Sequence, residues 1–330
     1  MKTNELRATD RPLAAVYDTA LLDLDGVVYR SHDAVPHAVP SLLAAAEGGM
    51  RLAYVTNNAS RTPEAVAAHL VELGLPATAE EVVTAAQAVA RLIAEQVPSG
   101  AAVLAIGGEG LFKALTEQGL TLVKSADDDP AAVVQGFVPE TRWVDLAEAA
   151  YAVGRGVPWF AANTDLTMPT ARGIAPGNGA LVTAVARATG KWPIAAGKPE
   201  PALHRETMIR TGAKNPLVVG DRLDTDIEGA NRAGVDSLLV FTGVTDADGL
   251  LEAKPDQRPT YIAADLRGLL EPARAPERDG TGWRCGAWRA EMADGELKCK
   301  RDDSSGSDGD DPLDELRARC AAAWAHADAE

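Results

Sequence analysis

Cysteine, histidine and aromatic residues are scarce in this sequence. Three cysteines, five histidines and an aromatic fraction of 5% occur in 330 residues. The cysteines, Cys285, Cys299 and Cys320, lie near the C-terminal end and have neither short paired spacing nor a second cluster that would complete a zinc site. This pattern excludes a disulfide-stapled scaffold and fits a reduced, cytoplasmic setting.

The sequence also has few positively charged residues and no long apolar runs. Lysine plus arginine number 32 against 48 aspartate plus glutamate, which gives a formal net charge of -16. Such a surface repels phosphate backbones and anionic headgroups, so we expect neither nucleic acid nor a membrane as a partner. The N-terminal segment lacks the apolar stretch of a signal peptide, and no window reaches the roughly 18 apolar residues of a membrane span. We therefore expect a cytoplasmic protein.

Short runs of valine, leucine, isoleucine and alanine alternate with amphipathic helical segments along most of the chain. This alternation is typical of a parallel sheet buried under helices, so it predicts an α/β fold with a doubly wound parallel sheet. The length allows about two domains. The predicted strands fall into a core set, residues 20–24, 51–56, 217–220 and 238–241, and a central set, residues 103–106, 133–138 and 159–162.

The order of these strands predicts an insertion. Core strands lie on both sides of the central set, so residues 85–191 are interpreted as a domain inserted into a discontinuous core rather than as a tandem neighbour. The core then comprises residues 14–84 and 192–270. The remaining residues, 271–330, follow a linker rich in proline, glycine and charge and form a small C-terminal module.

The C-terminal module has its own local signals. Segments 283–293 and 296–301 are expected to pair as a hairpin across Asp294 and Gly295, and a helix is expected over residues 312–327. The acidic tract between them does not place its carboxylates and glycines where a calcium-binding EF-hand loop needs them, which favours a solvated linker. The strand and helix order suggests a fragment of an acetyltransferase-like fold. Because no glycine-rich acyl-CoA loop is present, we expect an interaction role and no second activity.

The clearest motif is Leu22-Asp23-Leu24-Asp25-Gly26, where an apolar run ends in two carboxylates. Burying both in mid-strand would be costly, so a position beyond the strand end is expected. Gly26 permits a tight turn, so one aspartate can act as nucleophile or metal ligand and the other as acid and base. Taken alone, the motif is equally compatible with a simple hairpin turn beside a solvated Asp23.

A second acidic cluster, Asp221, Asp224 and Asp226, follows the apolar run 217–220. In an open parallel sheet, functional side chains gather outside the carboxyl ends of the strands, so the two acidic clusters are expected to converge. Converging carboxylates repel one another unless a cation joins them. Oxygen ligands without nearby histidine or cysteine indicate a hard ion, and Mg²⁺ is the usual choice where phosphate completes the coordination.

Two further segments favour a phosphate site. Thr56, Asn57 and Asn58 offer a hydroxyl and successive backbone amides to phosphate oxygens, and Lys198 offers a fixed cation. Each is weak by itself, because Thr56 is also a plausible strand end, the asparagines suit an Asx-turn and Lys198 suits an ordinary surface. Their occurrence in the order DxD, T, K and GDxxxxD is hard to explain by coincidence.

The four segments, spelled DLDGVV, VTNN, AGKP and VGDRLDTDIEGANRAG, resemble the four motifs of the haloacid dehalogenase (HAD) superfamily of phosphohydrolases. The resemblance is strongest to subfamily IIA, the branch of 4-nitrophenyl, phosphoglycolate, glycerol 3-phosphate and pyridoxal phosphatases. It covers residues 17–270. It implies a HAD-like, Rossmann-like core with a large α/β cap inserted between the second and third motifs, where residues 85–191 lie.

The resemblance also implies roles for residues in the first three motifs. Asp23 would be the nucleophile that forms an aspartyl-phosphate, and Asp25 the acid for the leaving alkoxide and then the base for water. Thr56 and the amides of the two asparagines that follow it would hold the phosphoryl oxygens, and Lys198 would pair with them.

The implied cofactor is Mg²⁺. The resemblance assigns its ligands to the carboxylate of Asp23, the backbone carbonyl of Asp25 and the carboxylate of Asp221. Asp226 would lie close to these ligands without binding the metal directly. No motif residue is missing, so the resemblance implies an active enzyme. The physical chemistry agrees, because positioning and charge neutralisation are nearly all that phosphoryl transfer asks of a protein.

The inserted cap is expected to select the substrate. Its end, from Ala162 to Pro169, resembles the cap loop that faces the active site in this branch, and Asn163, Asp165 and Met168 are the candidate specificity residues. The alternative is that this loop merely turns the chain and that Asn178 caps a helix over residues 180–189.

The function expected is Mg²⁺-dependent hydrolysis of small phosphomonoesters, with glycerol 3-phosphate or phosphoglycolate as leading substrates. Pyridoxal phosphate or broad 4-nitrophenyl phosphate hydrolysis is the alternative. Two alternatives are more remote. A sugar phosphomutase usually has a small helical cap directly after the first motif. A phospho-acceptor signalling domain carries an adjacent acidic pair on one strand and a lone acceptor aspartate on another. Caps of this branch often make dimer contacts, which makes a homodimer the candidate assembly.

Overall fold

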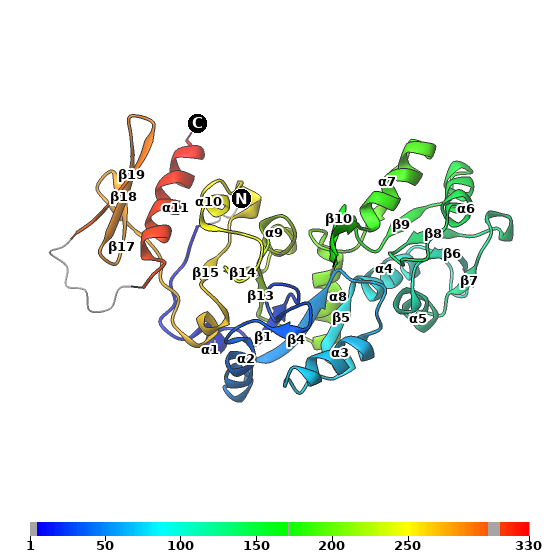
Figure 1. The fold of residues 1–330 in the computed structure, drawn as a ribbon, viewed down its shortest axis with the longest axis horizontal. Coiled ribbons are helices and arrows are strands. Elements are labelled where there is room, and N and C mark those ends of the chain that lie inside the picture. The colour runs from blue at the N-terminus through cyan, green and yellow to red at the C-terminus, as the bar shows by residue number, and fades with distance from the viewer. Residues whose placement is uncertain (1–4, 171, 303–310, 330) are drawn as a thin grey trace. The chain divides into compact units, whose positions relative to one another are not determined.

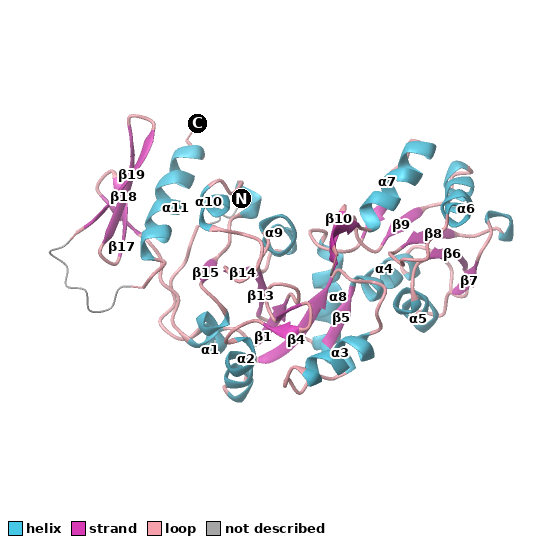
Figure 2. Cartoon of the chain, viewed as in Figure 1, coloured by secondary structure: helices cyan, strands magenta, loops and turns pink. Residues whose placement is uncertain are grey.

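The computed structural model describes residues 5–170, 172–302 and 311–329 (Figure 1, Figure 2). The chain divides into two compact units. The first unit comprises Met1–Leu52 and Ala213–Glu330, and the second comprises Ala53–Gly212. Within the described parts of the chain, no helix is both long and apolar enough to span a membrane.

The first unit contains a run of four parallel strands. Their order is β15-β14-β13-β1, and nearly every residue in them is buried, as expected for a parallel sheet covered by helices. Because the strands are parallel, the residues that follow each one lie at the same edge. The elements of this sheet and its surroundings are β1 (Thr19–Leu22), β13 (Pro216–Gly220), β14 (Asp236–Val240), β15 (Tyr261–Ala263), α1 (Leu13–Val16), α2 (Ala38–Glu47), α9 (Glu228–Ala233), α10 (Ala247–Leu251) and the hairpin β2 (Tyr29–Arg30) with β3 (Asp33–Ala34).

The second unit begins within β4 (Arg51–Thr56), which pairs in parallel with β5 (Val82–Thr84). The helix between them is α3 (Pro63–Glu72), and a capping side chain stabilises its start. Thr62 accepts a hydrogen bond from the amide of Ala65 at 3.3 Å, and proline occupies the first helical position. Two further helices of this unit, α4 (Ala85–Ala94) and α8 (Pro201–Thr211), pack against each other.

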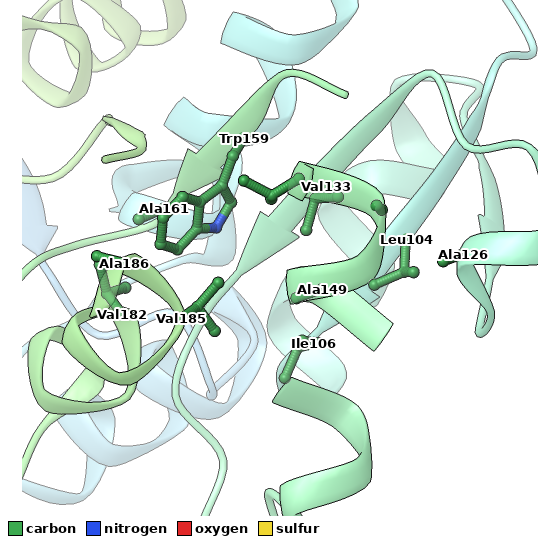
Figure 3. Close-up of a cluster of buried hydrophobic side chains, with 12 residues drawn as sticks. Leu104, Ile106, Ala126, Val133, Ala149, Trp159, Ala161, Val182, Val185 and Ala186 are labelled. Carbon is green, nitrogen blue, oxygen red and sulfur yellow. The ribbon is translucent and has the colours of Figure 1, made fainter. Parts of the chain in front are cut away.

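A second parallel sheet lies in the same unit, with the order β12-β9-β8-β6-β7. Figure 3 shows the apolar cluster between this sheet and its helices, where Trp159 and Val133 of the strands face Val182 and Ala149 of two helices. The elements are β6 (Ala102–Ile106), α5 (Glu109–Glu117), β7 (Thr121–Val123), β8 (Ala132–Gln135), α6 (Trp143–Gly154), β9 (Trp159–Ala161), the antiparallel pair β10 (Thr167–Thr170) and β11 (Gly173–Pro176), α7 (Asn178–Thr189) and β12 (Ile194–Ala195).

The C-terminal segment forms a four-stranded antiparallel sheet and a helix. The expected hairpin is present between β18 and β19, and Asp294 and Gly295 both have the positive φ that such a two-residue turn requires. The expected strand over 283–293 is two strands, because a turn at Gly286 interrupts it. The acidic tract 303–310 lies outside the described residues. The elements are β16 (Glu277–Asp279), β17 (Gly282–Cys285), β18 (Trp288–Ala293), β19 (Glu296–Arg301) and α11 (Asp314–Ala327).

Helix α11 packs on two apolar surfaces within the first unit. Toward the antiparallel sheet, Ala318 and Ala322 contact Cys285 and Ala290. On another side, Leu316, Cys320 and Trp324 join a cluster with residues of the parallel sheet and α10, among them Leu239, Ile262 and Leu250. The C-terminal segment therefore shares a hydrophobic core with the parallel sheet. The boundaries 14–84, 192–270, 85–191 and 271–330 stay a prediction about domains.

Candidate active site

Three carboxylates of the first unit come together at the edge of the parallel sheet. Asp23 follows β1, Asp221 follows β13, and Asp226 lies in a π-helical turn, η3 (Leu223–Ile227). One oxygen from each lies within 4.8 Å of the other two. Asp221 and Asp226 are each only 1% exposed, and Asp23 is half-buried. The expected convergence of the two acidic clusters is therefore present for these three residues.

Asp221 is held by the loop that follows β14. The amide of Val244 donates to its Oδ2 at 2.7 Å, and the amide of Thr245 donates to its backbone carbonyl at 3.1 Å. Glycine is required next to this side chain, because a Cβ at Gly243 would lie 1.8 Å from Oδ2 and one at Gly26 would lie 2.7 Å away. The Asp221 carboxylate is thus fixed in direction before any ligand binds.

Asp226 is held by its own turn. Its Oδ2 accepts a hydrogen bond from the amide of Arg222 at 3.1 Å, and a Cβ at Gly220 would lie 2.2 Å from the Asp226 Cβ. The π-helical geometry of η3 directs the buried side chain back onto the end of β13, and such turns frequently occur at functional sites. Asp224 of the same turn is exposed instead and pairs with Arg222 at 2.8 Å.

Asp25 has a different environment from Asp23. It is exposed and forms an isolated β-bridge with Tyr29, and the amide of Gly26 donates to the Tyr29 carbonyl at 2.8 Å. Gly26 has a φ of +87°, which glycine adopts without strain. The tight turn expected at Gly26 is present directly after Asp25, and of the two carboxylates Asp23 is half-buried whereas Asp25 is exposed.

The residues of this cluster fit Mg²⁺. Three carboxylates so close together repel one another when ionised, and a divalent cation relieves that repulsion. All three donors are hard oxygen ligands, the kind that Mg²⁺ prefers. The glycines at positions 26 and 243 keep side-chain atoms away from Asp221.

The predicted phosphate-binding residues lie in the second unit, where Asn57 connects them. Its side chain forms two hydrogen bonds with the backbone of Lys198: the Lys198 amide donates to Oδ1 at 2.8 Å, and Nδ2 donates to the Lys198 carbonyl at 3.1 Å. The amide of Asn58 donates to Thr56 Oγ1 at 3.1 Å. Thr56 and Lys198 are buried and Asn58 is exposed. The structure therefore brings the VTNN and AGKP segments together.

The predicted cap residues occupy different places in the second unit. Asn163 is buried and donates from Nδ2 to the Asn57 carbonyl at 2.7 Å. Asp165 accepts from Asn57 Nδ2 at 3.2 Å. Met168 is half-buried in β10, where it pairs with Ala175. Asn163 and Asp165 therefore contact the phosphate-binding segment, whereas Met168 has no hydrogen bond to it among the described residues.

One buried side chain near Lys198, that of His204, was missed by the sequence analysis. The His204 side chain is buried in α8 near Lys198, and burial, followed by the charge of Lys198, lowers its pKa to about 3. No signal in the sequence marks His204, because the buried residues of α8 are Leu203, His204, Glu206 and Thr207, of which only the first is apolar. Gly177, and not Asn178, precedes the first helical residue of α7, so the alternative in which Asn178 caps this helix is wrong.

Comparisons with known proteins identify the family of the chain. The model of the haloacid dehalogenase-like hydrolases matches residues 20–121, and a HAD-hydrolase-like model matches residues 195–269. The chain is 49% identical over 278 residues to the D-glycerol 3-phosphate phosphatase of Mycobacterium tuberculosis, a match that covers 83% of this chain and 77% of that protein. The chain belongs to the haloacid dehalogenase-like hydrolase family.

Other members of the HAD family are similar as well. An acid sugar phosphatase of Staphylococcus saprophyticus is 36% identical, with 77% of this chain and 97% of that protein covered. The structure of a glycerol phosphate phosphatase from M. tuberculosis in complex with magnesium has a TM-score of 0.87 and 45% identity, over 96% of this chain and 92% of that one. A p-nitrophenyl phosphatase from Archaeoglobus fulgidus has a TM-score of 0.71 and 29% identity, over 77% and 98%.

The predicted family, the α/β fold and the enzyme class, a phosphoric monoester hydrolase, are confirmed by these similarities. A model of a GCN5-related N-acetyltransferase-like domain matches residues 285–330, in agreement with the strand and helix order of the C-terminal segment. The roles assigned to individual site residues are not tested by the comparisons and stay predictions.

Proposed function

We propose that this chain hydrolyses small phosphomonoesters with the help of Mg²⁺ and that glycerol 3-phosphate is its main substrate. The observation that carries the proposal is the group of three carboxylates, Asp23, Asp221 and Asp226, whose oxygens lie within 4.8 Å of one another. The relative that hydrolyses D-glycerol 3-phosphate supports this substrate over phosphoglycolate, the other leading candidate.

In this proposal, Asp23 attacks the phosphoryl group and forms an aspartyl-phosphate. Asp25 first protonates the leaving alkoxide and then, as a carboxylate, takes a proton from the water that hydrolyses the intermediate. The exposure of Asp25 supports a role in proton transfer with substrate and water, and the partial burial of Asp23 supports a role as nucleophile.

Thr56, the amides of Asn57 and Asn58, and Lys198 bind the phosphoryl oxygens in this proposal. Their donors supply positive potential where charge develops in the transition state. The two hydrogen bonds between Asn57 and the Lys198 backbone support a joint role for these two segments.

The proposed metal ligands are the Asp23 carboxylate, the Asp25 carbonyl and the Asp221 carboxylate. Asp226 lies close to these ligands and does not bind the metal directly. When bound, Mg²⁺ neutralises the carboxylates and the transferring phosphoryl oxygens. The donor chemistry supports this assignment, because each of the three ligands offers an oxygen and the Asp221 carboxylate accepts a hydrogen bond from the backbone amide of Val244.

We further propose that residues 85–191 form a cap in which Asn163, Asp165 and Met168 affect substrate choice. A homodimer, a cytoplasmic location and the absence of nucleic-acid partners belong to the same proposal. A broader specificity is the second candidate, because the similar proteins include acid sugar and p-nitrophenyl phosphatases. Pyridoxal phosphate is a further substrate to test.

The test is phosphate release from glycerol 3-phosphate, phosphoglycolate, pyridoxal phosphate and 4-nitrophenyl phosphate, with Mg²⁺ or with EDTA. Wild type is compared with Asp23→Asn and with Asp224→Asn. Asp224 is an exposed carboxylate of the second acidic cluster in the sequence and is not among the three carboxylates that come together. We expect Mg²⁺-dependent turnover in wild type and Asp224→Asn and none in Asp23→Asn.

Turnover that resists EDTA, or that survives in Asp23→Asn, would contradict the proposed mechanism. If no ester is hydrolysed but acetyl phosphate leaves a base-labile phosphoryl group on Asp23, a phospho-acceptor domain or a mutase becomes the better interpretation. The ester with the largest kcat/KM identifies the substrate class.

A further inference from the structure

A buried asparagine outside the four motifs is hydrogen-bonded to the phosphate-binding segment through one intermediate residue. Asn178, at the start of α7, is 1% exposed. Its Nδ2 donates to the carbonyl of Asn163 at 2.7 Å and to the carbonyl of Gln135 at 3.2 Å. Both partners are backbone carbonyls, which only accept hydrogen bonds, so the orientation of the Asn178 amide is determined.

The start of α7 is held against the segment that contains Asn163. A Cβ at Gly177 would lie 2.3 Å from the Asp165 carbonyl oxygen, and one at Gly179 would lie 2.1 Å from the Thr164 carbonyl oxygen. The amide of Gly179 donates to the Asp165 carbonyl at 2.9 Å. Asn178 is therefore placed by close backbone packing on both sides, and its side chain does not serve as the helix cap, since Gly177 holds that position.

Asn163 links Asn178 to Asn57 through hydrogen bonds. Its carbonyl accepts from Asn178, its Oδ1 accepts from the amide of Asp165 at 3.3 Å, and its Nδ2 donates to the Asn57 carbonyl at 2.7 Å. Asn163 is itself buried, at 6% exposure. The three asparagines thus form a directed series of hydrogen bonds, each from a side-chain amide to a main-chain carbonyl.

The last bond of the series orients a peptide plane of the phosphate-binding segment. In a trans peptide, the carbonyl of Asn57 and the amide N–H of Asn58 point in opposite directions from one rigid plane. Asn163 holds the carbonyl, and Thr56 Oγ1 accepts from the N–H at 3.1 Å. The plane is fixed at both ends, and its N–H holds the hydroxyl of Thr56, which the proposed function assigns to phosphate binding.

We propose that Asn178 is a positioning residue for the phosphate-binding segment and acts through Asn163 on the Asn57–Asn58 peptide plane. This inference rests on the proposed phosphatase function. Catalysis by positioned donors is sensitive to displacements of about 1 Å, which can cost about a hundredfold in rate. A change at Asn178 therefore alters phosphoryl transfer although the residue touches no substrate.

The principal variant is Asn178→Leu, which keeps the branched shape and removes the donor. The matched control is Gln135→Met. The Gln135 side chain is fully buried beside the same helix and has no hydrogen-bond partner among the described residues, while its backbone carbonyl, the acceptor for Asn178, is unaffected by the substitution. Both variants are made in the full chain and checked for folding by circular dichroism.

Two readouts separate positioning from a structural role. They are kcat and KM for glycerol 3-phosphate with Mg²⁺, and the inhibition constant of orthovanadate, which mimics the five-coordinate phosphorus of the transition state. For Asn178→Leu we expect kcat/KM to fall by about tenfold to a hundredfold, mainly in kcat, and the vanadate inhibition constant to rise by a similar factor. For Gln135→Met both values stay within about twofold of wild type.

A double-mutant cycle tests whether Asn178 acts through Asn163. If Asn178 acts through Asn163, Asn163→Leu combined with Asn178→Leu is no slower than Asn163→Leu alone. Multiplicative effects of the two substitutions would overturn the inference, as would an unchanged vanadate constant in a folded Asn178→Leu protein. If Asn178→Leu does not fold, Asn178→Ser, whose hydroxyl is too short to reach the same carbonyls, carries the same expectations.

The two proposals fail in different ways. A wild-type protein that hydrolyses no phosphomonoester and ignores vanadate contradicts the proposed function. An active, vanadate-sensitive wild type whose kinetics are unaffected by the loss of the Asn178 donor contradicts only the positioning role.

Discussion

At the scale of single residues, the contrast between Asp23 and Asp25 decides what each carboxylate can do. They are two residues apart in the sequence and differ in burial: Asp23 directly follows β1, and Asp25 directly precedes the turn at Gly26. Asp23 joins Asp221 and Asp226, whereas Asp25 is exposed. One carboxylate among other carboxylates is suited to a metal and to covalent chemistry, and an exposed one is suited to exchanging protons with substrate and water.

The proposed role of Asp25 as the base that activates water predicts a burst of nitrophenolate release in the Asp25→Asn variant. With 4-nitrophenyl phosphate, whose leaving group needs no proton, Asp25→Asn still forms the aspartyl-phosphate but hydrolyses it about 10²- to 10⁴-fold more slowly. We expect stopped-flow absorbance to record about one equivalent of nitrophenolate per enzyme and then slow turnover. Steady, burst-free turnover at the wild-type rate would show that Asp25 is not the base.

The close approach of Gly243 to Asp221 predicts a loss of metal affinity. A Cβ at position 243 would lie 1.8 Å from Asp221 Oδ2, so Gly243→Ala displaces the carboxylate. We expect the dissociation constant for Mg²⁺, measured by isothermal titration calorimetry, to rise by about tenfold or more, as is typical when the support of a metal ligand is altered. Gly154→Ala, a helical position with nothing within 4 Å of the added Cβ, should leave it unchanged.

At the scale of secondary-structure elements, α11 joins the C-terminal sheet to the parallel sheet. Its residues Leu316, Cys320 and Trp324 bury their side chains against the parallel-sheet cluster, and Trp324 Nε1 donates to the Leu250 carbonyl at 3.2 Å. The guanidinium of Arg258 lies 5.3 Å from the Trp324 ring centroid. The helix is therefore a structural part of the first unit, whatever further role the C-terminal segment has.

This packing predicts a large effect of truncating Trp324. The side chain is 4% exposed, and removal of a buried tryptophan costs about 3–5 kcal/mol in the free energy of unfolding. We expect Trp324→Ala to lower the urea midpoint by a corresponding amount. Trp143→Ala, at a helical tryptophan that is 77% exposed, serves as control and should change stability by less than about 0.5 kcal/mol. Equal effects would contradict the packing described for α11.

At the scale of the whole molecule, the chemistry-bearing residues are divided between the two units. The first unit carries the carboxylates and the second carries Thr56, Lys198 and the asparagines that hold them. The matched family segments, residues 20–121 and 195–269, draw on both units. A change in global stability therefore affects every part of the proposed machinery at once.

His204 predicts how that global stability depends on pH. Burial lowers the pKa of His204 from 6.5 to about 3, so between these values the unfolded chain binds a proton that the folded chain does not. This residue's contribution to stability is therefore complete above about pH 6.5 and is lost as the pH falls, by up to about 1.4 kcal/mol per pH unit. In urea unfolding at pH 7, 6 and 5, His204→Met should lose less stability on acidification than wild type. Parallel curves would contradict the assignment.

The sequence by itself determined the elements and the chemistry of the motifs. Apolar runs predicted β4 with its observed bounds and the strands β1, β13 and β14 to within a few residues. Carboxylates after buried strands predicted the meeting of Asp23 with Asp221, since parallel strands end at one edge. Local propensity and the geometry of a parallel sheet suffice for these conclusions.

Only the tertiary structure decided which side chains support the motif residues. No spacing in the sequence indicates that Asn178 donates to the Asn163 carbonyl, or that Gly243 must lack a Cβ beside Asp221. The same holds for His204 and for the burial of Trp324 against the parallel-sheet cluster. These contacts join segments distant in the chain, and their energies depend on distance and burial, which the order of residues does not specify.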